Sequence, residues 1–232
     1  MARRRIAERS GTGGGRRLGR GCHRHGLGVT AVVALCLSGC ALGERPSFDE
    51  TAIITADGTM TGDPAIDAVL ARLDDVGAAQ FTATYRAVVT FGGITTDVTV
   101  VQAGGGARRS TTIGEVTFRT IDGTVSTCVQ GVCTSGSDAV RVSDTGVTPE
   151  LAFGAMAKRL RRDAVARIGD TVASTMEVSG ETATCVDVPV SGGTKVYCAL
   201  ANGVLARFVG GDVTVELTSY EPVVDPAAFD VP

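Results

Sequence analysis

The chain has 232 residues, enough for one ordinary domain or two small ones, and its hydrophobic content of 44% is typical of a globular protein. Its only two histidines, His23 and His25, lie within the first 39 residues. If that stretch is removed during export, the mature chain cannot form a Ser-His-Asp triad, a Cys-His pair or a zinc site with histidine ligands. No hydroxyl has a recognisable activating base either. We therefore expect no enzyme activity, no catalytic residue, no metal site and no cofactor.

Charge divides the chain into a basic head and an acidic body. Residues 1–39 hold eight arginines and one acid, Glu8, which gives a net charge of +7. Because the whole chain carries −3, residues 40–232 carry −10. The positive charge is therefore not on the part that folds, and nucleic acid is not an expected partner. A basic head of this kind is typical of a targeting signal.

An apolar run at 27–37 follows the arginines and ends in Leu37-Ser38-Gly39-Cys40. Eleven apolar residues suit the core of a signal peptide and are fewer than the roughly 20 that span a bilayer. The last four residues resemble the lipobox of bacterial lipoproteins, in which the cysteine is lipidated and becomes the new N-terminus. The alternative is a short buried helix that ends in cysteine. We predict a signal peptide at 1–39, a lipidated tether at 40–60, and a lipid anchor on Cys40 that holds the protein on the extracytoplasmic face of the cell membrane.

Four cysteines remain after the signal peptide and Cys40 are set aside. Cys128 and Cys133 are symmetric about Gln130-Gly131, and Cys185 and Cys198 are symmetric about the turn residues at 191–193. Each pair would face its partner across a hairpin, at the Cα separation of about 5.5–6 Å that disulfides prefer. A four-cysteine zinc site is the competing interpretation, but it usually needs short CxxC spacings that are absent here. We predict the disulfides Cys128–Cys133 and Cys185–Cys198.

The hydrophobic pattern predicts two helices and about nine strands. Asp63 and Pro64 can start a helix that runs to Val76, and Thr148 and Pro149 can start a second helix that runs to about residue 164. Arg108 and Arg109 fall in an expected loop. Strands are predicted from alternation and from their bounding turns, at 81–91, 94–101, 115–121, 124–129, 172–178, 183–190, 194–200, 204–209 and 212–220. Consecutive meanders with two helices imply one α+β domain built on an antiparallel sheet.

Three stretches carry a resemblance to a known family. They are the pair Cys128 and Cys133, the segment 196–205 with its Val-Tyr-Cys and Asn-Gly-Val-Leu, and the ending at 226–232. With the lipobox and the order of elements, they resemble the LolA/LolB-like superfamily of lipoprotein and lipid carriers, and within it the actinobacterial LppX/LprG-type lipoproteins. The resemblance covers residues 61–232. It implies a curved, half-open antiparallel sheet whose concave face is closed by two helices, with an apolar cavity between them.

The resemblance also implies which surfaces would line that cavity. One strand and one helix each present a continuous apolar face, at a period of two and of about 3.6 residues respectively. The same faces could instead be a filled core. We expect the cavity to be lined by Phe81, Tyr85, Val89, Phe118, Phe153, Met156 and Leu160.

Two classes of function follow. In the first, residues 61–232 form a LolA-like domain that binds or transfers a lipid or another hydrophobic ligand. In the second, the same fold is a ligand-free interaction or sensor module that contacts a membrane or envelope protein. In both, the protein reaches the membrane through the lipid on Cys40. A cavity of roughly 300–1,000 Å³ with apolar walls would favour the first class.

The lipobox makes one testable prediction. Cys40→Ala removes the thiol that would be acylated, so the variant should accumulate as an uncleaved precursor that takes up no labelled fatty acid. Metabolic labelling with a fatty acid and the electrophoretic mobility of the protein measure both effects, with Cys36→Ala as the control that should still be labelled and cleaved. Equal labelling of the Cys40→Ala variant would contradict the lipoprotein assignment.

Overall fold

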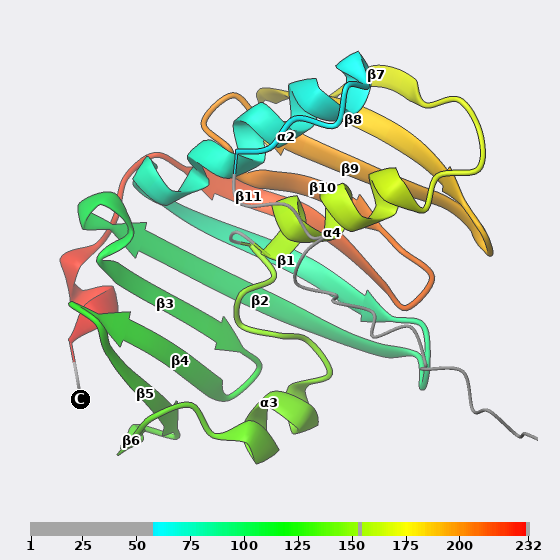
Figure 1. Ribbon diagram of the computed structural model, residues 1–232. Coiled ribbons are helices and arrows are strands. Elements are labelled where there is room, and N and C mark those ends of the chain that lie inside the picture. Colours follow the sequence, from blue (N-terminus) through cyan, green and yellow to red (C-terminus); the bar gives the residue numbers. More distant parts are fainter. Residues whose placement is uncertain (1–57, 153–154, 231–232) are drawn as a thin grey trace, which may run out of the picture. The chain divides into compact units, whose positions relative to one another are not determined.

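The computed structural model describes residues 58–152 and 155–230. Within them, eleven strands form one antiparallel sheet in the order β6-β5-β4-β3-β2-β1-β11-β10-β9-β8-β7, which does not close on itself (Figure 1). Every pair of neighbouring strands in the sheet, except β1–β11, is also consecutive in the sequence. The strands are β1 (Phe81–Val89), β2 (Ile94–Ala103), β3 (Arg108–Ile113), β4 (Val116–Ile121), β5 (Thr124–Val129), β6 (Val132–Ser135), β7 (Val172–Val178), β8 (Glu181–Val190), β9 (Gly193–Leu200), β10 (Leu205–Val209) and β11 (Val213–Glu221).

Helix α2 (Pro64–Asp75) forms as the sequence predicts. The Asp63 carboxylate accepts hydrogen bonds from the backbone N–H groups of the first turn, and Pro64 occupies the first helical position. Its apolar stripe is buried, and a 3₁₀ turn, η1 (Val76–Ala78), extends its end. Gly203 lies against this end, where a Cβ would overlap the backbone of Arg72 and Val76. The Asn-Gly turn between β9 and β10 therefore lets the sheet approach the helix closely.

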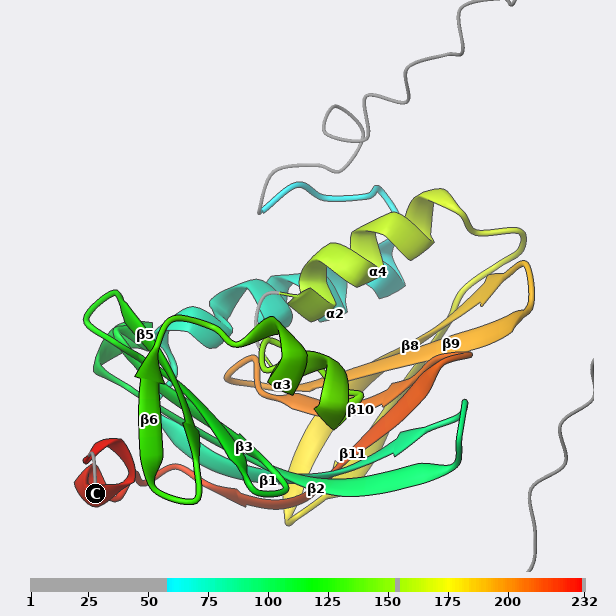
Figure 2. The ribbon, with the colours of Figure 1, turned by 90° about the horizontal axis from the view of Figure 1, so that it is seen from below.

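The other described helices are α3 (Ala139–Thr145) and α4 (Ala155–Val165), with short 3₁₀ turns η2 (Gly104–Gly106) and η3 (Pro226–Phe229). The sheet is strongly curved, and α2, α3 and α4 lie on its concave side (Figure 2). Helix α2 contacts α4 and strands β7, β8 and β9, and α4 contacts β8. Residues from these helices and from the inward face of the strands form one hydrophobic core.

The pairing of β1 with β11 joins the two meanders into one sheet. Its register runs from Thr82 opposite Glu221 to Val89 opposite Val213. Thr218 is an extra residue in β11, because Thr84 pairs with Ser219 and Tyr85 with Leu217. This bulge resets the alternation, so Tyr220 lies opposite inward-facing Ala83 instead of pointing to the outer face.

The predicted count of about nine strands is wrong, because the predicted ranges omitted β3 and also β6, although the Cys128–Cys133 hairpin implied a strand after Gln130-Gly131. Arg108 and Arg109 begin β3 instead of lying in a loop. Five of the six residues of β3 are polar, so its sequence shows no alternation of apolar residues, and only pairing with β2 and β4 makes it a strand. β6 has four residues, too few for a periodic pattern, and it is held by its hairpin with β5.

The predicted number of helices is also wrong, since α3 is a third one. It has no buried residue, so no apolar stripe indicated it, and it starts at the capping carboxylate of Asp138. The middle helix begins at Ala155, not at Pro149, because Thr148–Leu151 forms a hydrogen-bonded turn. Strand β1 ends at Val89, two residues earlier than predicted, and Phe91 leaves the sheet.

Both hairpin disulfides are present, in agreement with the pairing predicted from the sequence. Each has a Cα–Cα distance of 4.0 Å, shorter than the expected 5.5–6 Å. Counting outward from the two-residue turns, Cys128–Cys133 and Cys185–Cys198 both fall at non-hydrogen-bonded positions of their ladders. Antiparallel strands come closest there, with Cα atoms about 4.5 Å apart.

The disulfide loops predict the relative cost of removing each bond. Replacing Cys185 and Cys198 by alanine opens the longer loop, with a sequence separation of 13, and should cost about 3 kcal/mol. The matched control, Cys128→Ala with Cys133→Ala, opens the shorter loop, with a sequence separation of 5. It should lower the free energy of unfolding by about 2 kcal/mol. Denaturant unfolding of the oxidised proteins measures both values. A larger loss from the shorter loop would contradict the loop-entropy explanation.

Candidate functional site

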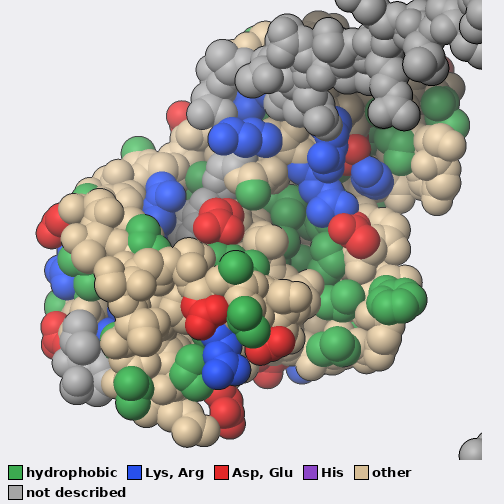
Figure 3. Space-filling model, turned by 60° about the horizontal axis from the view of Figure 1, so that its bottom comes forward, with side chains coloured by type: hydrophobic (Ala, Val, Ile, Leu, Met, Phe, Trp, Pro, Cys, Tyr) green, Lys and Arg blue, Asp and Glu red, His purple; other side chains and the backbone are tan. Residues whose placement is uncertain are grey.

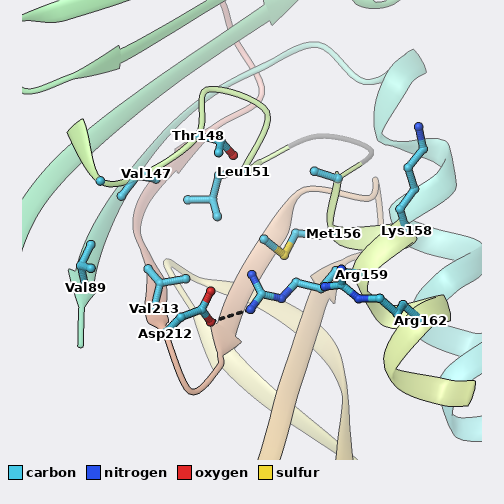
Figure 4. A pocket seen from close by; sticks show the side chains of 12 residues that line it. Val89, Val147, Thr148, Leu151, Met156, Lys158, Arg159, Arg162, Asp212 and Val213 are labelled. Carbon is cyan, nitrogen blue, oxygen red and sulfur yellow. Dashed lines mark hydrogen bonds and ion pairs between the residues drawn. The ribbon is translucent and has the colours of Figure 1, made fainter. Parts of the chain in front are cut away.

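A pocket of about 460 Å³ opens between the sheet and the segment that links α3 to α4 (Figure 4). Its walls come from the end of β1, the start of β11, the turn after α3 and the N-terminal half of α4. These segments are far apart in sequence, and the β1–β11 pairing together with the packing of α4 brings them to one place. The lining residues are Val89, Gly146, Val147, Thr148, Leu151, Ala155, Met156, Lys158, Arg159, Arg162, Asp212 and Val213.

The inner wall of this pocket is apolar. Val147, Leu151, Met156 and Val213 are each at least nine-tenths buried, and Val89 is half-buried beside them. Figure 4 shows Leu151 and Met156 pointing into the space between the sheet and α4. The turn after α3 reaches this position because Gly146 takes the left-handed conformation that ends the helix. The site can therefore take an apolar group out of water.

The edge of the pocket is basic. Helix α4 contributes Lys158, Arg159 and Arg162, and β11 is preceded by one acid, Asp212. Figure 3 shows basic side chains gathered beside hydrophobic ones on this side of the molecule. Lys158 and Arg162 are exposed, and neither has an ion-pair partner among the described residues. The edge thus carries two cations that are available to an anionic group.

Arg159 is held in place by two contacts. Its guanidinium lies 2.5 Å from the Asp212 carboxylate and 4.6 Å from the centre of the Phe208 ring. Burial opposes ionisation of Asp212, but the hydrogen bond and charge of Arg159 outweigh it and lower the pKa of that carboxyl below its ordinary value. Asp212 therefore stays charged at neutral pH and largely neutralises Arg159, so the net positive charge of the pocket edge comes from Lys158 and Arg162.

Buried polar contacts fix α4, which forms one wall of the pocket. The Asp163 carboxylate, itself buried, accepts hydrogen bonds from the Tyr197 hydroxyl and from the Lys195 ammonium at 2.7 Å. Burial, followed by the hydrogen bond to Asp163, raises the pKa of Tyr197, so its hydroxyl remains a donor. The Tyr197 ring also packs on Phe208, with centroids 4.9 Å apart. The sheet thus contacts α4 at two successive turns, through Arg159 and Asp163.

On its other side α4 is tied to α2. The buried Arg161 guanidinium forms an ion pair with Asp74 and donates a hydrogen bond to the backbone carbonyl of Thr59 at 3.1 Å. Arg161 therefore lies between the two helices and not on a solvated face. Asp74 is thus a structural partner of α4. Helical spacing shows which residues share a face, but not whether a second helix covers that face.

The predicted lining residues fall in three places. Val89 and Met156 line the pocket, and Phe118 lines a smaller one of about 230 Å³ near Arg109 and Thr111. Phe81, Tyr85 and Leu160 are fully buried in the hydrophobic core and are not among the lining residues of either pocket. Phe153 lies outside the described residues, as do Cys40 and most of the predicted tether. The role of these side chains as ligand contacts stays a prediction.

Several pocket residues had no signal in the sequence. Arg159 and Asp212 are 53 positions apart, and nothing in the sequence pairs them. Leu151 belongs to a segment that was predicted to start a helix but forms a turn, and Val147 lies just before that segment. Among the described residues, no helix is long and apolar enough to cross a membrane. In the same part of the chain, no group of His, Cys, Asp and Glu could hold a metal ion.

The chain matches no known family model and no curated protein sequence. Among solved structures it is similar to the lipoprotein LppX of Mycobacterium tuberculosis, with 16% identity over 72% of this chain and 100% of that chain and a TM-score of 0.42. It is also similar to MucB, with 14% identity over 72% of this chain and 62% of that chain and a TM-score of 0.47. A chain of the Pseudomonas aeruginosa MucA/MucB complex is also similar, with 14% identity over 68% of this chain and 56% of that chain and a TM-score of 0.43. LppX is of the lipoprotein type that the sequence resembles.

The attachment of α4 to the sheet makes a testable prediction. Tyr197→Phe removes one of the donors to buried Asp163 and should lower the free energy of unfolding by about 1–3 kcal/mol. Tyr220→Phe is the matched control, because its hydroxyl, hydrogen-bonded to the Asn202 amide at 2.6 Å, is only half-buried, and its loss should stay below about 1 kcal/mol. Denaturant unfolding measures both. Equal losses would show that the Asp163 contact does not fix α4.

Proposed function

We propose that the protein is an exported, membrane-anchored lipoprotein that binds an amphiphilic lipid in the pocket between β1, β11 and α4. The observation that carries this proposal is the combination of an apolar inner wall with two unpaired cations at the edge. The anchor itself rests on the lipobox that ends in Cys40. The domain would then work at the membrane surface, where such ligands are found.

The size of the pocket supports a ligand site. Its volume of about 460 Å³ lies within the range of roughly 300–1,000 Å³ that small-molecule sites occupy. Voids in a filled core are usually no larger than a water molecule. The space under α2 is different, because Phe81, Tyr85 and Leu160 fill it as core. We therefore assign the ligand to the pocket at the end of the concave face where α3 is connected to α4.

The polarity of the pocket indicates the class of ligand. Val147, Leu151 and Met156 would contact an acyl or similar apolar chain. Lys158 and Arg162 would contact an anionic head such as a carboxylate or a phosphate, to which arginine can bind with two parallel hydrogen bonds. A neutral hydrocarbon would leave this edge unused. We therefore infer that the ligand carries both an apolar chain and a negative charge.

A pair of tryptophan substitutions on α4 tests the proposal. Met156 and Leu160 lie one helical turn apart, but Met156 lines the pocket and Leu160 is fully buried in the core. Met156→Trp should fill free volume, leave the free energy of unfolding within about 0.5 kcal/mol and displace the ligand. Leu160→Trp is the control and should cost about 1–3 kcal/mol through overpacking.

The measurements are denaturant unfolding and native mass spectrometry of protein purified from its own host. The proposal predicts bound lipid on the unsubstituted protein and its loss from the Met156→Trp variant. If the unsubstituted protein carries no lipid and Met156→Trp destabilises it as much as Leu160→Trp does, the pocket is not a ligand site. The fold would then serve as a ligand-free interaction or sensor module.

A further inference from the structure

The hairpin between β1 and β2 exposes a large aromatic side chain. Phe91 is 93% exposed, the highest value among the exposed large hydrophobic residues of the described chain. Ile94, on the other side of the same turn, is 49% exposed. Gly92 and Gly93 both have positive φ, which allows a four-residue loop between Val89 and Ile94 and keeps Phe91 out of the sheet. A side chain of this size in water loses the favourable free energy of burial, so its exposure calls for an explanation.

This tip lies beside the pocket. Val89, which lines the pocket, is directly opposite Ile94 in the ladder, so the two side chains are on the same face of the sheet. Thr90, next to Phe91, donates its backbone N–H to the carbonyl of Asp212 at 2.9 Å. Asp212 in turn holds Arg159 at the basic edge. The exposed apolar tip, the apolar pocket and the unpaired cations are therefore contiguous.

We propose that the β1–β2 hairpin tip is a membrane-docking element that inserts Phe91 and Ile94 into the interface of an anionic lipid bilayer, with Lys158 and Arg162 facing the lipid headgroups. Aromatic side chains favour the bilayer interface, and basic side chains are attracted to the negative surface of anionic membranes. The inference rests on the same basic edge as the proposed function and adds the surface through which the pocket would meet the membrane.

The charge distribution favours a bilayer over other occupants of this surface. Residues 40–232 carry a net charge of −10, so the body as a whole is repelled by an anionic membrane. The described part of the pocket edge, by contrast, has three cations and one acid. Screening limits these interactions to about 8–10 Å, so the local charge at the pocket edge decides the contact. The protein would thus approach the membrane in one orientation, with the pocket side first.

The absence of tryptophan from the chain makes the test direct. Phe91→Trp in the full chain places a single tryptophan at the tip, and Val132→Trp places one at a residue of β6 that is 72% exposed and far from the pocket in the sheet order. Both proteins are added to vesicles of phosphatidylglycerol and phosphatidylcholine, with and without brominated acyl chains. We expect a blue shift and quenching for the tryptophan at position 91, and neither for the tryptophan at position 132. An anchor in the vesicle holds both proteins equally, so the difference between them reports orientation.

Three outcomes decide the proposal. Quenching at position 91 only, weaker on vesicles of pure phosphatidylcholine, supports it. If vesicles change the blue shift and the quenching of the two tryptophans equally, the proposal is overturned. A blue shift at position 91 that depends on protein concentration without vesicles also overturns it, because the tip would then be covered by a second copy of the chain.

A second variant separates this proposal from the proposed function. In the unlipidated chain, Phe91→Ala should reduce binding to anionic vesicles by about tenfold or more. Co-sedimentation measures this, with Val132→Ala as the control that changes little. Phe91 does not line the pocket, so the Phe91→Ala variant should keep its bound lipid in native mass spectrometry. Loss of lipid without loss of vesicle binding would contradict the pocket assignment, and unchanged vesicle binding would contradict the docking element.

Discussion

The pairing of β1 with β11 is the contact on which the rest of this structure depends. All other strand pairs join consecutive strands and are closed locally by hairpin turns or, between β2 and β3, by the short η2 connection. Without the β1–β11 ladder, the chain would form two separate meanders, each with an unpaired central edge. The ladder also places the start of β11 beside the end of β1, and so it brings Val213 and Asp212 to Val89. Because partners such as Thr82 and Glu221 are far apart in sequence, this is the pairing with the largest loop-closure cost.

Helix α4 is positioned by ionic contacts on two sides, and these define the pocket. Asp163 is bound by Tyr197 and Lys195 of β9, while Arg161 is bound by Asp74 of α2. Buried charges are costly unless they are paired, so each of these contacts specifies one arrangement of the helix more strictly than apolar packing would. The apolar side chain of Leu160 completes the attachment to the core. Met156, one turn earlier, is left facing a space that the sheet does not fill.

The two proposals describe one surface. An apolar wall, a basic edge and an exposed aromatic tip occur together on the side of the sheet where β1 turns into β2. The remainder of residues 40–232 is acidic, and in the proposal this contrast would orient the protein at an anionic membrane. A bound amphiphile could then pass between bilayer and pocket without crossing a strongly hydrated region.

The sequence alone determined the features that depend on neighbouring residues. These include the capped helix at Pro64, the alternation of β1, the two-residue turns and, through their symmetry, both disulfide pairings. It did not reveal β3, whose polar residues become a strand only between β2 and β4, nor the short helix α3, which buries nothing. It also placed Phe91 on the apolar face of a strand, although the turn at Gly92 ends that strand at Val89. Which apolar faces fill a core and which line a pocket was decided only in the tertiary structure, because periodicity identifies a face but the distance to the opposing element depends on contacts between residues far apart in sequence.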